Sequence, residues 1–455
     1  NAGANAYNTA VGYSAGTAIT TGVSNTLIGG IAGDALTDAD NNVAVGAQAL
    51  TVDTLGSKSV AIGDSALKVQ NFTTATNTYN TAVGDSAGEA VTTGTHNTLI
   101  GALAGDALTD ADFNVALGHN SLSIDTLGSK STAIGRSALA TQNFTTATDT
   151  FNTAVGFNAG VNVTTGVQNT LIGGLTGDAL TDADYNVAIG YAALGSDTLG
   201  SRSVAIGRSA LEVQNFTTAT NTYNTAIGYD AGGAVTTGIS NTLIGGEAGN
   251  AITTGQKNTM LGDRAGDATT TGGGNVIIGT TCDASAVGTN NSIVMGEAAT
   301  GVGDNNFTFG NGGTDSNIAF GATSITAPSD ERYKEEITTS TAGLSFINDL
   351  RPVTFKWRKE KDVPSDHPTY VEGSDKRVME SNGEINHGFI AQEVKAVIDN
   401  HSEIKDGFNM WSEQGLDKDG NSTGGRQRLG DGALVPILVK AIQELTARIK
   451  TLEDG

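Results

Sequence analysis

A five-residue block that ends in glycine recurs along most of this chain. It consists of Asn or Ser, Thr or Val, two apolar residues and Gly, as in NTAVG from Asn8 and SVAIG from Ser59. The block runs with few exceptions from Asn8 to Gly279, and its glycines lie 17, 17, 17 and then 21 residues apart. This spacing gives sixteen rungs and a super-period of 72 residues. Self-similarity at a fixed period indicates stacked units that share one core.

Each block predicts a short β-strand that cannot bury its apolar face alone. Stacking identical strands gives a solenoid or β-roll, in which each coil hydrogen-bonds to the next. At about 4.8 Å per rung, the predicted coils span about 77 Å. The closing glycine suits a bend with positive φ or a close backbone approach, and the Asn or Ser can bond turn amides. The sequence therefore predicts a mainly β fold with a repetitive shaft.

Composition changes abruptly near Pro328. All five prolines lie at or beyond this position, whereas 50 of the 62 glycines lie before it. From Ala286 to Phe320 the repeat decays into NNSIVMG, NNFTFG and NIAFG. We therefore expect a shaft over residues 1–285, a β neck over 286–328 and a different domain over 329–455. Because the chain opens inside repeat-like sequence, we interpret it as a fragment or processed product whose N-terminal anchor is missing.

The charge of the chain excludes some partners. The net charge is −23, and residues 1–329 contribute −17 of it. So acidic a surface repels phosphate backbones, so we expect no nucleic-acid partner. No apolar run reaches the roughly 18 residues that a membrane span needs, so no span is predicted. Cys282 is the only cysteine, which rules out an intrachain disulfide and suggests a small buried residue.

The shaft contains recurrent acidic and aromatic residues. TDAD segments place carboxylates at alternate positions, a spacing that can bind calcium or form a solvated turn. They lack a twelfth-position Glu and a GGxGxD nonapeptide, so the turn is favoured, and we expect no metal and no other cofactor. Single aromatic residues beside the rungs favour packing or ladder stacking over glycan binding. They include Tyr13, Tyr79, Phe113, Phe151, Tyr185 and Tyr223.

The blocks NTAVGYSAG, NVAVGAQAL and SVAIGDSAL resemble the head repeats of trimeric autotransporter adhesins, which also occur in phage fibres. The resemblance covers roughly residues 1–280, although those repeats are typically shorter. It implies that three chains pack their rolls side by side about a threefold axis.

A nucleophile and a lysine lie close together after the neck, in the segment SDERYK from Ser329 to Lys334. A lysine can act as the base for a serine only if burial or nearby positive charge lowers its pKa, and Arg332 is a candidate contributor. Taken alone, this spacing is more typical of a surface turn.

The following segments, LSFINDLRPVTFKW from Leu344, HGFIAQEV from His387 and ALVPILVKAIQEL from Ala433, give this spacing a context. Together they resemble the intramolecular chaperone autoprocessing domain of phage tail fibres and tailspikes, of the endosialidase type, which is a serine peptidase family. The resemblance implies an α+β domain over residues 329–455, with Ser329 as the catalytic serine and Lys334 as its partner.

The same resemblance implies that the domain forms a homotrimer, guides three shafts into register and then cleaves the Ser329-Asp330 bond. A serine hydroxyl that attacks its own carbonyl carbon would close a strained four-membered ring. Attack across chains and attack by a lysine-activated water therefore both stay open.

Apolar residues repeat every seven positions near the C-terminus and predict a coiled-coil helix over about 433–453. The rule for β-branched and Leu positions favours two strands, whereas the family resemblance implies three. We assign His387 to the core or to hydrogen bonding. The seam residues are Val435, Leu438, Ile442, Leu445, Ile449 and Leu452.

These features favour a phage tail fibre or spike, located in the virion and extracellular, that attaches to a host receptor. The receptor is expected to be a glycan or an outer-membrane component, and self-cleavage is the only expected enzymatic activity. Two alternatives stay open: a bacterial surface adhesin with the same chaperone, and a tailspike that degrades polysaccharide.

Overall fold

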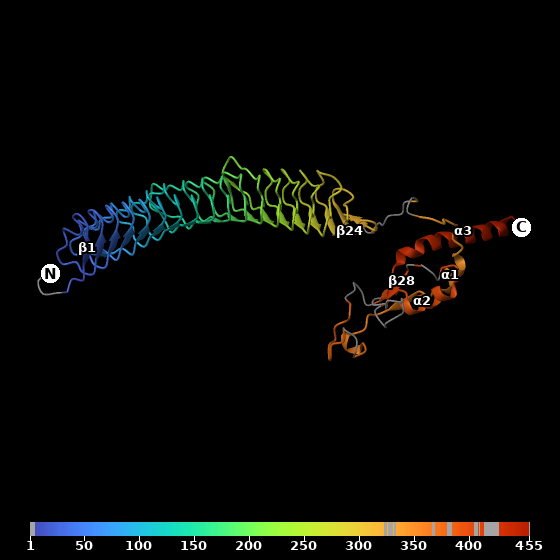
Figure 1. Cartoon of the computed structure of the whole chain (residues 1–455). Helices are drawn as coiled ribbons and strands as arrows, with labels where there is room; N and C mark the ends of the chain where they lie inside the picture. Colours follow the sequence, from blue (N-terminus) through green and yellow to red (C-terminus); the bar gives the residue numbers. More distant parts are fainter. Residues whose placement is uncertain are drawn as a thin grey trace. The chain divides into compact units, whose positions relative to one another are not determined.

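The structure is a computed structural model that describes residues 5–322, 325, 331, 334–365, 369–379, 385–404, 408, 410–413 and 427–454. The chain divides into two compact units, residues 1–329 and 330–455. The first unit is a long stack of coils, and the second is a smaller α+β fold (Figure 1). The predicted mainly β fold with a β-solenoid shaft is confirmed.

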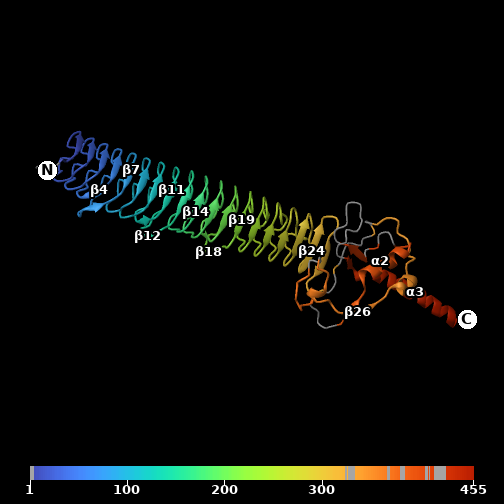
Figure 2. The same cartoon turned by 90° about the horizontal axis from the view of Figure 1, so that it is seen from below.

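One long sheet runs through the first unit, with one strand from each coil (Figure 2). Its neighbouring strands pair in parallel and in a constant register, so that Thr9 pairs with Thr26 and Ala10 with Leu27. The strands are β1 (Thr9–Val11), β2 (Thr26–Ile28), β3 (Val43–Val45), β5 (Val60–Ile62), β7 (Thr81–Val83), β8 (Thr98–Ile100), β9 (Val115–Leu117), β11 (Thr132–Ile134), β13 (Thr153–Val155), β14 (Thr170–Ile172), β15 (Val187–Ile189), β17 (Val204–Ile206), β19 (Thr225–Ile227), β20 (Thr242–Ile244), β21 (Thr259–Leu261), β22 (Val276–Ile278), β23 (Ile293–Glu297), β24 (Asn306–Asn311) and β25 (Ser316–Ala319).

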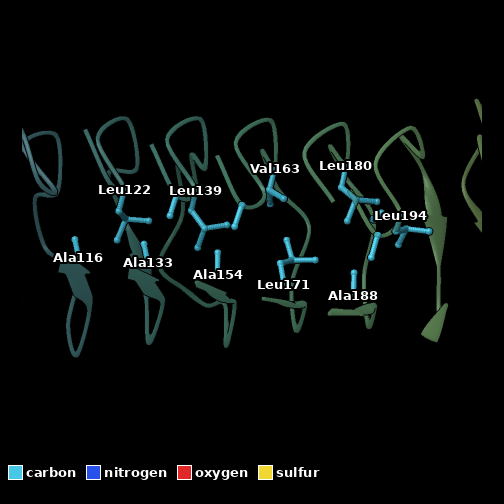
Figure 3. Close-up of a cluster of buried hydrophobic side chains, with 14 of the residues drawn as sticks. Ala116, Leu122, Ala133, Leu139, Ala154, Val163, Leu171, Leu180, Ala188 and Leu194 are labelled. Atoms are coloured by element: carbon cyan, nitrogen blue, oxygen red, sulfur yellow. The ribbon is translucent and has the colours of Figure 1, made fainter. Parts of the chain in front are cut away.

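The core of the shaft lies inside the coils. Successive residues of a strand point to opposite faces, so only the middle residue of each rung points inward. From β2 to β22 this residue is buried, as at Ala154 and Leu171. It packs against side chains from the opposite wall of the coil, such as Val163 and Leu180 (Figure 3). Small Ala and long Leu side chains therefore fill a narrow core that is continuous from coil to coil.

The glycine that closes each rung is required by its surroundings. Gly156 has a φ of +142°, and a Cβ atom added there would lie 2.2 Å from the carbonyl oxygen of Gly173 in the next coil. The two predicted reasons for glycine, positive φ and close backbone approach, thus apply together.

A ladder of buried side-chain amides accompanies the strands. The Asn25 carbonyl oxygen accepts the backbone N–H of Asn42 at 2.9 Å, and the Asn25 amide donates to the carbonyl of Ala39 at 2.7 Å. The same contacts recur in the other coils that open with Asn, for example at Asn97 and Asn169. Each Asn therefore satisfies backbone groups that the turns leave unpaired inside the coil.

The longer, 21-residue coils carry Ser in place of this Asn. In the first of them the Gln70 amide donates to the Ser59 hydroxyl at 2.8 Å and to the Asp53 carboxylate at 2.6 Å. The Gln70 carbonyl accepts from Asn80 at 2.9 Å, which reconnects the amide ladder. Equivalent networks centre on Gln142 and Gln214. The inserted residues thus supply a side chain that spans the gap left by the shorter Ser.

Short strands flank these inserted residues. They form three two-stranded parallel sheets beside the main sheet. The pairs are β4 (Gly56–Ser57) with β6 (Thr76–Asn77), β10 (Gly128–Ser129) with β12 (Thr148–Asp149), and β16 (Gly200–Ser201) with β18 (Thr220–Asn221).

The solenoid continues beyond the sixteen predicted rungs. Strands β23 and β24 extend the parallel ladder into the segment interpreted as a neck, and β25 then pairs with β24 in the antiparallel direction. The remaining NNSIVMG and NNFTFG blocks therefore still form rungs. Cys282 is fully buried in this part of the shaft, as predicted.

The second unit combines helices with short antiparallel strand pairs. Helix α1 (Leu344–Asp349), helix α2 (Ala391–Asn400) and helix α3 (Leu434–Glu453) surround a core that includes Phe346 and Val394. The predicted terminal helix is confirmed. The other elements are β26 (Val353–Phe355) with β27 (Asn386–Gly388), β28 (Trp411–Glu413) with β29 (Gln427–Leu429), and the 3-10 turns η2 (Glu360–Asp362) and η3 (Asp431–Ala433).

Candidate functional site

The outward face of the long sheet carries uncharged side chains along its length. From β1 to β22 the first residue of each rung is Thr or Val, and the third is Val, Ile or Leu. The third residue is 57% exposed at Val11, 42% at Leu117 and 45% at Leu261. A contiguous exposed apolar surface is typical of a protein interface.

Two further columns lie at the ends of the rungs. We call the residues just before each opening Asn or Ser the leading column, and those just after each strand-end glycine the trailing column. In the leading column the Tyr79 ring lies 5.1 Å from His96, which stacks on Phe113 at 4.8 Å. In the trailing column Arg136 lies 5.5 Å above the Phe157 ring. The predicted ladder stacking is therefore confirmed at Tyr79 and Phe113.

The TDAD carboxylates make hydrogen bonds to the preceding coil. Asp40 accepts the backbone N–H of Val23 at 2.7 Å, and Asp112 accepts the backbone N–H and the hydroxyl of Thr95 at 2.6 and 2.9 Å. These contacts fit the turn interpretation. Within the described ranges, no group of three or more His, Cys, Asp or Glu residues could hold a metal ion.

Helix α3 has two apolar faces. Leu434, Ile437 and Ala441 are buried, and the Glu444 carboxylate accepts the backbone N–H of Leu344 at the start of α1 at 3.0 Å. The predicted seam occupies the other face, where its side chains are between 41% and 81% exposed. These side chains belong to Val435, Leu438, Ile442, Leu445, Ile449 and Leu452.

A charged histidine cluster joins α1 to the end of α2. The His401 ring lies 2.9 Å from the Asp349 carboxylate and 2.8 Å from that of Glu403, and its edge meets Phe346. Hydrogen bonds to Glu403 and Asp349 raise the pKa of His401 above its usual 6.5. The sequence analysis missed this cluster because no local motif joins the three polar residues. Of the two roles assigned to His387, the core role is wrong, since its side chain is exposed on β27, and the hydrogen-bonding role stays a prediction.

In the sequence, the predicted catalytic pair spans the boundary between residues 1–329 and 330–455. Ser329 and Asp330 fall outside the described residues. Lys334 is exposed, and its backbone N–H donates to the carbonyl of Glu331 at 3.0 Å, which closes a turn. The Ser329/Lys334 pair therefore stays a prediction.

A long β-solenoid followed by an α+β domain with an exposed apolar helix face defines a class of protein. This arrangement supports a tail-fibre or spike-type protein that carries an intramolecular chaperone. No helix in the described part of the chain is long and apolar enough to cross a membrane.

The comparison with protein families agrees with this class. Residues 329–403 match the family model described as chaperone of endosialidase. Domains of this family are self-cleaving chaperones. No curated protein and no solved structure gives a significant match to the chain.

Proposed function

We propose that this chain is part of a trimeric phage tail fibre or spike that attaches to the host surface. Its C-terminal unit directs the assembly of three chains and is then removed by autoproteolysis at the Ser329-Asp330 bond. Ser329 and Lys334 form the catalytic pair, which acts either across chains or through a water that Lys334 activates, and the mature shaft stays outside the cell as part of the virion.

The uncharged outer face of the sheet is the observation that carries this proposal. Residues 1–329 have a net charge of −17, so two shafts repel each other wherever acidic side chains meet. The Thr or Val and the Val, Ile or Leu residues of the rungs form a face on which two shafts can meet without this charge repulsion. A partner that covers such a face needs the same length and the same coil period. Further copies of the chain meet both requirements.

The exposed seam of α3 supports the same conclusion. An apolar residue at every first and fourth position of a heptad is the pattern by which helices pack in a coiled coil. A neighbouring face of α3 packs on its own domain, whereas the seam side chains stay exposed and can meet other copies of α3. The same domain then brings three chains together before their shafts pair.

Cleavage after assembly gives the fibre a lasting benefit. Near-identical coils allow shafts to pair in wrong registers, and a domain that joins the chain ends turns later pairing into an intramolecular step. Once that domain is removed, a chain that unfolds has lost its guide for correct refolding. The assembled shaft is then protected by slow unfolding.

Light scattering on the full chain tests the assembly step. For the uncleaved chain we expect three times 46.0 kDa. After cleavage we expect three times the mass of residues 1–329. A variant with Ile442→Asp places a charge in the α3 seam, where Ile442 is 62% exposed, and we expect it to remain monomeric. The matched control is Lys450→Asp on the same helix, outside the seam, which should still form trimers. A monomeric wild type would contradict the proposal.

A further inference from the structure

In several coils the leading and the trailing residue match each other in kind, although Tyr79/Asp85 and His96/Ala102 do not. The two members of a coil are six residues apart, with the rung between them, so an extended chain separates them by up to about 20 Å. The ring and cation contacts of the shaft follow a single column, as in Lys130 over Phe151 and Arg136 over Phe157. The match between the columns therefore calls for an explanation outside the single chain.

Aromatic residues occur together in both columns. Three coils in the middle of the shaft each carry one aromatic residue before the rung and one after it, all between 44% and 56% exposed. Single exposed rings on a soluble protein need no partner, whereas rings that recur at both ends of the same coils favour a partner surface that contacts both columns. The coils are those of Phe151/Phe157, Tyr185/Tyr191 and Tyr223/Tyr229.

Four coils carry a charged residue in both columns. Two of them pair opposite charges, Lys58 with Asp64 and Lys257 with Asp263, and the other two carry cations in both columns, Lys130/Arg136 and Arg202/Arg208. All four side chains of the opposite-charge pairs are exposed. Asp263 also forms an ion pair at 3.4 Å with the exposed Arg264. A second cation beside Asp263 would extend this pair into a charge network.

Small residues complete the match. Ser24 shares its coil with Gly30, and a Cβ atom added at Gly30 would meet nothing within 4 Å. Glycine at this position is therefore not required by the fold of the single chain. In this coil both columns carry a small residue, whereas in the aromatic coils both columns carry a large one.

We propose that in the trimer the leading column of each shaft packs against the trailing column of its neighbour at the same level. This inference rests on the proposed trimer. A contact between two different edges is heterologous, and three such contacts close a ring about a threefold axis. The outer sheet faces then point towards the axis, and the paired columns seal the three seams.

Cations in the columns also fit this packing. Arg202 shares its coil with Arg208, which would set like charges at one level. Arg202 already lies over Tyr185 and Tyr223, and Arg208 lies over Tyr229, so each charge rests on a ring of its own column.

The residues of the two columns do not disfavour a shift of one chain against another by one super-period. The second and third super-periods carry Arg136 and Arg208, and Phe157 and Tyr229, at equivalent positions 72 residues apart. A slip by one super-period would therefore bring similar residues together over much of the shaft. This gives the C-terminal unit a specific task, which is to prevent a 72-residue slip.

Cysteine pairs test the inference in the full chain. The variant Ser24→Cys with Gly30→Cys places thiols in both columns of one coil, and Ser24→Cys with Ala47→Cys places the second thiol one coil further. Disulfides need Cα atoms within about 7 Å, so neither pair bridges a rung within one chain. After mild oxidation we expect covalent trimers on a non-reducing gel from at least one of these variants. Ser24→Cys with Gly174→Cys, many coils apart, should give at least about tenfold fewer.

The results separate this inference from the proposed function. Trimers by light scattering without a cross-link in either variant would overturn the column pairing and leave the trimer standing. A monomeric chain would overturn both. A charge exchange gives an independent test: Lys58→Asp should slow trimer formation, and Lys58→Asp with Asp64→Lys should restore it. Failure of the double variant to recover would count against the pairing.

Discussion

The Gln70 side-chain amide donates to the Asp53 carboxylate at 2.6 Å, although the two residues belong to successive passes of the chain. Asp53 also accepts the backbone N–H groups of Gly56 and Phe72, both at 3.0 Å. Burial raises the pKa of Asp53, and these hydrogen bonds oppose the rise. Gln70 is therefore the side chain that makes the buried Asp53 and the shorter Ser59 compatible with the coil.

Replacing Gln70 should loosen the first 21-residue coil. Gln70→Ala leaves the Asp53 carboxylate, the Ser59 hydroxyl and the Asn80 amide each without one partner, and we expect a loss of about 3 kcal/mol. Hydrogen exchange of the Asn97 backbone N–H, which donates to Asn80, reports this loss locally. Thr73→Ala, at an exposed site of the same coil, should change nothing measurable.

Two adjacent glycines should respond differently to substitution. At Gly173, φ is +140° and an added Cβ would lie 2.4 Å from the carbonyl oxygen of Gly190, so Gly173→Ala should cost at least about 2 kcal/mol. At Gly174 the nearest atom would be Tyr191 Cδ2 at 3.7 Å, so Gly174→Ala should be tolerated. Thermal unfolding followed by circular dichroism compares them. Equal losses would mean that the coils do not approach as closely as described.

The last coils of the shaft should lose stability as pH rises. Burial and a hydrogen bond with Asp267 raise the pKa of Asp283 to about 7. An acid whose pKa is raised by folding adds stability below pH 3.8 and loses it as pH rises through about 7. Asp283→Asn should therefore raise the melting temperature at pH 8 and have less effect at pH 4. Glu297→Gln, at an exposed site of β23, serves as the control, and equal effects of Asp283→Asn at both pH values would contradict the prediction.

The C-terminal unit should also respond to pH, through His401. Glu403 and Asp349 raise its pKa, so its contribution is fully present below pH 6.5 and is lost as pH rises through the higher folded value. Both tryptophans lie in this unit, so their fluorescence follows its unfolding selectively. The unit should melt at a lower temperature at pH 8.5 than at pH 6. In His401→Gln this difference should shrink, and an unchanged difference would exclude His401 as its source.

The sequence predicted the shaft well because one constraint acts on every coil. The glycine spacing identified the rungs, and the fixed register follows from stacking. The sequence did not predict that Leu139, with a φ of 50°, adopts a conformation usually reserved for glycine. Nor did it connect Gln70 with Asp53, because that contact depends on how the inserted residues fold. The sequence did not predict the His401 cluster for a similar reason. Asp349 lies 52 residues before His401 and Glu403 lies two residues after it, so the contact with Asp349 depends on the fold.

Intact mass spectrometry of freshly expressed wild type, beside Ser329→Ala and Lys334→Ala, tests the central claim most directly. The account predicts that the wild type separates into residues 1–329 and residues 330–455, whereas both variants keep the full 455 residues. If all three chains stay full length while they form trimers, the C-terminal unit is a permanent cap, and the proposed roles of Ser329 and Lys334 are wrong.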